Sequence, residues 1–189
     1  MNDLIELIQS PRKYFSRDKD ISMKFMYLLF LIFLALGTYV GVFVVSNKDI
    51  DKVIGMVHFS KWFIFLFSVV GGIIGTIIYV NIVYFVVYIT CNKIEKKTYN
   101  KKIVKKLLYT SYVVPYILSY IITSIYSLLG GQSGIFTNIF SLIISALVSI
   151  FIYMTLKLNI KTKNVHKFLP VIIFIISIIP VIKYFIKLH

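Results

Sequence analysis

Acidic residues are scarce in this sequence, and charged residues of either sign are nearly absent from its long apolar runs. The chain has seven Asp and Glu residues against 21 Lys and Arg, and all seven lie outside those runs. Four of the five runs contain no Asp, Glu, Lys or Arg, and the fifth contains only Lys183, near its end. Proton relays, ion-coupled transporters and voltage sensors depend on ionisable groups inside the membrane. The sequence therefore disfavours all three classes.

Catalytic and metal-binding patterns are also missing. The chain has three histidines, His58, His166 and His189, which are far apart in the sequence. It contains no H-E-x-x-H, G-x-S-x-G or Walker pattern. Its single cysteine, Cys91, excludes an intrachain disulfide, and we expect an unmodified side chain there, with acylation as the alternative. We predict that the protein is not an enzyme and binds no cofactor or metal.

The sequence does contain long runs of apolar residues. Hydrophobic residues make up 59% of the 189 residues, and the mean hydropathy is +0.88. A helix needs roughly 20 apolar residues to cross the hydrocarbon core of a bilayer, and the runs show no strand-like alternation. We predict an all-α polytopic membrane protein with a cytoplasmic N-terminal segment, 1–24, and a five-helix transmembrane domain, 25–189. The predicted spans are 25–46, 62–90, 107–129, 136–156 and 168–186.

The basic residues predict an orientation. The formal net charge is +14, and in a soluble protein that would suggest nucleic acid as a partner, but here the lysines lie between apolar runs. Sixteen of the 21 Lys and Arg residues fall in the N-terminal segment and the second and fourth connections, which share one side of a five-span protein. Cytoplasmic segments carry the excess of Lys and Arg. We therefore predict a multi-pass protein of the cell membrane, with the N-terminus inside and the C-terminus outside.

The N-terminal segment has an amphipathic pattern. Leu4, Ile5, Leu7 and Ile8 share one side of a short helix, and the pair Ser10–Pro11 suits a new N-cap and first helical position. Tyr14 and Phe15 continue the apolar side beside three basic residues, Arg12, Lys13 and Arg17. This pattern predicts an interfacial helix on the inner leaflet. A docking element for a partner protein is the alternative.

Four tyrosines lie on one face of the third predicted span. At 100° per residue, their spacing confines them to a sector about 80° wide; they are Tyr109, Tyr112, Tyr116 and Tyr120. Pro115 lies off this face, and its missing N–H predicts a kink. The tyrosines have three interpretations: an aromatic belt at the membrane surface, helix packing inside the bundle, or the lining of a cavity.

Small residues and two amides are further candidates for helix packing. Gly37 and Gly41 are four residues apart in the first span, as are Gly71 and Gly75 in the second. This spacing lets helices approach closely, and we expect it to serve packing within the bundle rather than dimerisation. Asn81 and Asn138 lie in the spans, where we expect each to hydrogen-bond a neighbouring helix.

The second connection is strongly basic. Its candidate contacts to anionic lipid headgroups, or to an acidic face of a partner, are Lys96, Lys97, Lys101, Lys102, Lys105 and Lys106. Clusters of this kind next to a membrane span attract anionic lipids on the cytoplasmic side. The alternative is that these lysines only determine the topology.

Several segments together resemble the bacterial form of the Yip membrane family, named for interaction with Ypt/Rab GTPases. They are "SPRKYF" before the first span, "KKLLYTSYVVPYIL" leading into a third span with a central proline, and "YMTLKLNIK" closing the fourth span. The resemblance implies a non-enzymatic membrane protein. Eukaryotic relatives are associated with vesicle trafficking, and some bacterial ones accompany ABC exporters that protect against antimicrobial peptides. The D-L-Y-G-P core of eukaryotic relatives is not present, which argues against a Rab-type contact.

Three functional hypotheses follow. The first is a membrane scaffold or accessory protein that binds another membrane protein, with an ABC exporter of envelope defence as a candidate partner. The second is a stand-alone immunity protein that confers resistance to antimicrobial peptides. The third is a small-solute channel or transporter that uses the tyrosine face. In each case the lipid bilayer is the solvent, and no nucleic acid partner is expected.

Overall fold

The computed structural model describes residues 2–17, 22–44, 59–131 and 134–186, and within these ranges every regular element is a helix. Two short helices, α1 (Asn2–Gln9) and α2 (Pro11–Ser16), come first. The long helices follow: α3 (Lys24–Tyr39), α5 (Lys61–Ile89), α6 (Lys101–Leu128), α7 (Ile135–Met154) and α8 (Val165–Ile186). Three of them continue into π-helical turns, which are η1 (Val40–Val44), η2 (Thr90–Ile94) and η3 (Thr155–Asn159).

The prediction of an all-α protein with five apolar helices and a short N-terminal helix is confirmed, since each long helix has the length and composition to cross a membrane. Residues 45 and 46, which end the first predicted span, lie outside the described residues, and so do His58 and His189. Four basic residues also lie outside them: Lys19, Lys48, Lys52 and Lys187.

The helices begin where the sequence supplies a cap. α6 starts at Lys101, six residues before the predicted start, because the side chain of Asn100 accepts hydrogen bonds from the backbone N–H groups of Lys102 at 3.1 Å and Ile103 at 3.3 Å. Ser60 caps α5 in the same way, accepting from the N–H of Phe63 at 3.2 Å. Two turns of α6 therefore carry lysines before its apolar stretch begins.

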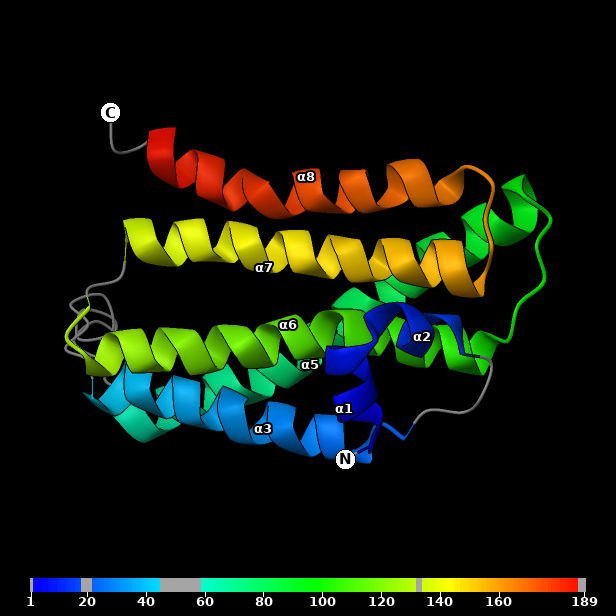
Figure 1. The fold of residues 1–189 in the computed structure, drawn as a ribbon. Coiled ribbons are helices and arrows are strands. Elements are labelled where there is room, and N and C mark those ends of the chain that lie inside the picture. The colour runs from blue at the N-terminus through cyan, green and yellow to red at the C-terminus, as the bar shows by residue number, and fades with distance from the viewer. Residues whose placement is uncertain (1, 18–21, 45–58, 132–133, 187–189) are drawn as a thin grey trace.

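Helix α6 is the centre of the bundle. It packs against α3, α5 and α7, whereas α8 packs mainly on α7 at the edge of the molecule (Figure 1). It has the lowest mean hydropathy of the five long helices and also the most buried residues. The most polar helix thus occupies the position with the least contact with lipid. This arrangement follows from the cost of exposing hydroxyl groups to hydrocarbon.

The N-terminal helices pack part of their apolar side against the bundle. Tyr14 and Phe15 are fully buried. The phenol of Tyr14 shares a hydrogen bond of 3.1 Å with the hydroxyl of Thr110 on α6, and the ring of Phe15 lies 5.1 Å from that of Phe151 on α7. An amphipathic pattern cannot distinguish a helix that faces lipid from one that faces its own bundle. Ile8 of α1, by contrast, is 72% exposed.

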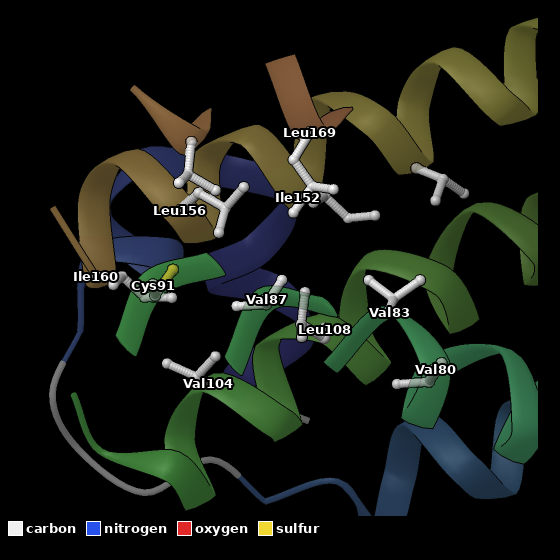
Figure 2. Packing of buried hydrophobic residues seen from close by; sticks show 12 residues of the cluster. Val80, Val83, Val87, Cys91, Val104, Leu108, Ile152, Leu156, Ile160 and Leu169 are labelled. Carbon is white, nitrogen blue, oxygen red and sulfur yellow. The ribbon is translucent and has the colours of Figure 1, made fainter. Parts of the chain in front are cut away.

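A cluster of buried apolar side chains joins α5, α6, α7 and α8 near the ends that carry the η2 and η3 turns. Figure 2 shows members of this cluster, among them Val87 of α5, Cys91 of η2, Val104 of α6 and Leu156 of η3. Cys91 is fully buried in this cluster. The thiol is therefore inaccessible in this arrangement, which favours the unmodified side chain over acylation.

We predict that Phe15→Ala lowers the free energy of unfolding by about 3–5 kcal/mol, because it removes a fully buried aromatic ring from the core. Ile8→Ala, at an exposed position of α1, is the matched control and should change stability by less than about 1 kcal/mol. Thermal or denaturant unfolding of the purified protein in detergent measures both. Equal effects of the two changes would contradict the burial of Phe15.

Candidate functional site

The tyrosine face of α6 forms aromatic contacts with two neighbouring helices. Tyr112 stacks on Tyr116 with ring centroids 4.3 Å apart, and Tyr79 of α5 lies 4.6 Å from Tyr112. Tyr109 lies 5.8 Å from Tyr27 and Tyr120 lies 6.2 Å from Phe30, both on α3. The four tyrosines are therefore partly buried against other rings of the bundle.

The two candidate amides behave differently. The Nδ2 atom of Asn81 donates to the Tyr109 hydroxyl on α6 at 3.2 Å and to the Ile77 carbonyl of its own helix at 2.7 Å. Asn138 instead donates to the carbonyl of Gly134 at 2.8 Å, at the start of its own helix. The expected contact with a neighbouring helix is thus present for Asn81, whereas the Asn138 bond satisfies a backbone group locally.

Pro115 lies inside α6, which continues through it to Leu128. Its side chain is buried, as is Ser111 one turn earlier. The hydroxyl of Ser111 donates to the carbonyl of Leu107 at 2.8 Å, and Thr110 donates to that of Lys106 at 3.1 Å. The hydroxyls next to the proline are therefore satisfied within the helix itself.

The glycine pairs divide into packed and open positions. A Cβ atom on Gly37 would lie 3.0 Å from Cδ1 of Tyr120, so α3 and α6 approach closely there. Gly41, Gly71 and Gly75 have no atom within 4 Å of an added Cβ. In the second span it is Gly72 that packs on α3, where an added Cβ would lie 2.9 Å from a methyl carbon of Leu34. Close approach of a neighbouring helix is thus seen at Gly37 and Gly72, and space is open beside Gly41, Gly71 and Gly75.

Two lysines in the first turns of α6 contact tyrosine rings of α5. The Nζ atom of Lys101 lies 5.0 Å from the centroid of Tyr88, and that of Lys105 lies 5.8 Å from the centroid of Tyr84. Four further candidates, Lys96, Lys97, Lys102 and Lys106, lie in the same connection or in the first two turns of α6. The lysines thus form a cationic border at this end of the bundle.

Glu95, the one acidic residue in that connection, has a role that the sequence did not indicate. Its carboxylate accepts hydrogen bonds from the backbone N–H groups of Lys163 at 2.7 Å, Asn164 at 2.7 Å and Val165 at 2.8 Å. These groups begin α8, where a negative charge is favoured. Burial raises the pKa of Glu95, but the three N–H donors outweigh burial and hold the pKa below its ordinary value.

The N-terminal segment is fixed to the same end of the molecule. Arg17 forms ion pairs with Asp3 and Glu6, and the side-chain amide of Asn159 donates to the Arg17 carbonyl at 2.9 Å. Burial raises the pKa of the Tyr14 phenol to about 12, so the phenol is neutral at physiological pH. The α1–α2 segment and the connections after α5 and α7 therefore meet at one end of the bundle (Figure 1).

A comparison with models of known protein families shows which family the chain belongs to. The Yip1 domain matches residues 5–184, nearly the whole chain. The chain belongs to the Yip1 domain family. Proteins of this family are generally non-enzymatic membrane proteins. No curated protein and no solved structure matches the chain.

Nothing in the described part of this Yip1 domain has the arrangement of a metal centre. No group of three or more His, Cys, Asp or Glu side chains is placed to hold an ion among the described residues. Membership and structure together support an integral membrane protein whose candidate functional features are its surfaces: the cationic border and the open face of α5.

We predict that Glu95→Ala destabilises the protein by about 1–2 kcal/mol at pH 7, since the start of α8 loses its acceptor. The depressed pKa means that the carboxylate contributes its full stability above the unfolded value, about 4.3, and loses it as the pH falls through the folded pKa. Unfolding measured from pH 7 to pH 3 should therefore show the wild type approaching Glu95→Ala at low pH. Parallel curves for the two proteins would contradict the proposed cap.

Proposed function

We propose that this Yip1 domain protein is a non-enzymatic membrane scaffold or accessory protein that binds another integral membrane protein through the outward face of α5. The observation that carries the proposal is the open space at Gly71 and Gly75, where an added Cβ atom would have no heavy atom of a neighbouring helix within 4 Å.

Helix α5 is the longest in the structure, with 29 residues, and it has the smallest buried share among the five spans. Its exposed apolar side chains include Phe67, Ile74, Ile78, Ile82 and Phe85. Apolar character alone does not drive helices together in lipid, because lipid tails are equally apolar. Small residues four apart do favour association, since they let two backbones approach. The face around Gly71 and Gly75 therefore suits a transmembrane helix of a partner.

An exporter of the ABC type is the partner class that the family resemblance suggests, with a role in defence against antimicrobial peptides. A stand-alone immunity protein is the alternative. The channel hypothesis has less support, because the tyrosine rings it requires are stacked on one another and on Tyr79. Six lysines of the α5–α6 connection would contact anionic headgroups, or an acidic face of the partner, on the cytoplasmic side.

The partner hypothesis predicts that Gly71→Leu combined with Gly75→Leu abolishes co-purification of a stoichiometric membrane protein in mild detergent. The double variant should fold normally, because both positions have open space. Gly41→Leu, also in open space but on the first span, is the matched control and should retain the partner. Recovery of the wild type alone in several detergents, or a partner retained by the double variant, would contradict the proposal.

The orientation proposed here places the N-terminus in the cytoplasm and the C-terminus outside the cell membrane. It is supported by the excess of Lys and Arg at the end of the bundle that holds the α1–α2 segment. Reporter fusions at the two termini should therefore report opposite compartments. Signals from the same compartment would contradict the five-span topology.

A further inference from the structure

A groove between α7 and α8 lies apart from the open face of α5. Its volume is about 290 Å³, close to the lower end of small-ligand pockets, about 300 Å³. The lining residues are Ala146, Ser149, Ile150 and Tyr153 of α7 and Pro170, Val171 and Phe174 of α8. The groove is apolar along most of its length, and its wall is formed by two helices that face the membrane.

One end of this groove carries a fixed cation. The Nζ atom of Lys157 donates to the hydroxyl of Tyr153 at 2.8 Å and lies 5.2 Å from the centroid of the same ring. The ring of His166 lies 5.6 Å from that of Tyr153. Lys157 is exposed, and it forms no ion pair with a carboxylate of the described residues.

A polar group also lies in the groove wall. Ser149 is 8% exposed, and its hydroxyl has no hydrogen-bond partner in the described part of the chain. A hydroxyl without a partner in a membrane protein is costly. The groove therefore offers an apolar surface, one unpaired hydroxyl and a cation at its end, which together match an amphiphile with an anionic head.

We propose that the α7–α8 groove binds an anionic phospholipid, with one acyl chain along the groove and the phosphate at Lys157. The cation lies at the end of the bundle that carries the other basic connections, where an anionic headgroup would meet it. One turn of a helix that is 10–12 Å across and 5.4 Å long occupies more than about 400 Å³, which exceeds the volume of the groove, about 290 Å³. A single acyl chain is the occupant that fits.

Native mass spectrometry of the full-length protein tests this with two probes, dioleoyl-phosphatidylglycerol and dioleoyl-phosphatidylcholine. Lys157→Gln should weaken binding of the anionic lipid about five-fold, the equivalent of about 1 kcal/mol for one lysine near a membrane surface. Binding of the zwitterionic lipid should not change. Lys24→Gln, at the start of α3, is the matched control and should leave both unchanged.

The groove itself is tested by filling it. Val171→Phe, at a position that is 53% exposed, should reduce binding of both lipids, as should Ala146→Leu if that variant folds. Ile143→Leu, on an exposed part of α7 outside the groove, should have no effect. The proposal is overturned if Lys157→Gln binds the anionic lipid as the wild type does, if Val171→Phe changes neither lipid, or if soluble glycerol phosphate displaces the anionic lipid.

Discussion

The cost of exposing unpartnered hydroxyl and amide groups to lipid determines how most of this chain is arranged. Helix α6 carries more of these groups than any other long helix, and it lies at the centre, in contact with α3, α5 and α7. Its hydroxyls bond to the carbonyls of the preceding turn, as Ser111 and Thr123 do, and its tyrosines contact rings of α3 and α5. The more apolar helices then surround α6 and face the membrane.

The same constraint explains the N-terminal segment. The hydroxyl of Thr110 lies in the core, where Tyr14 provides its inter-helical partner at 3.1 Å. Arg17 holds the segment together through Asp3 and Glu6, so that the charges near it are paired at the end of the bundle. The α1–α2 segment thus covers one end of the core, and Thr110 gives the buried phenol of Tyr14 a hydrogen-bond partner there.

The five spans and the positions of the basic connections could be predicted from the sequence, because length, apolarity and the placement of lysine are properties of the chain itself. The partners of individual residues could not. Gly71, Gly72 and Gly75 all lie in one short stretch of sequence. Which of them faces α3 depends on how the two helices pack, and in the structure it is Gly72 that lies against Leu34. Glu95 gave no signal in the sequence, since its partners lie 68 to 70 residues away.

The two proposed surfaces differ in the physical basis of recognition. At Gly71 and Gly75 an open helix face favours close contact between backbones, so a partner helix would bind through van der Waals packing. Between α7 and α8 the groove has less volume than one turn of a helix and ends at an exposed cation, so an anionic lipid would bind through an acyl chain and a charge. The groove lies on α7 and α8, whereas the glycine face lies on α5. The partner helix and the lipid would therefore contact different helices and could bind at the same time.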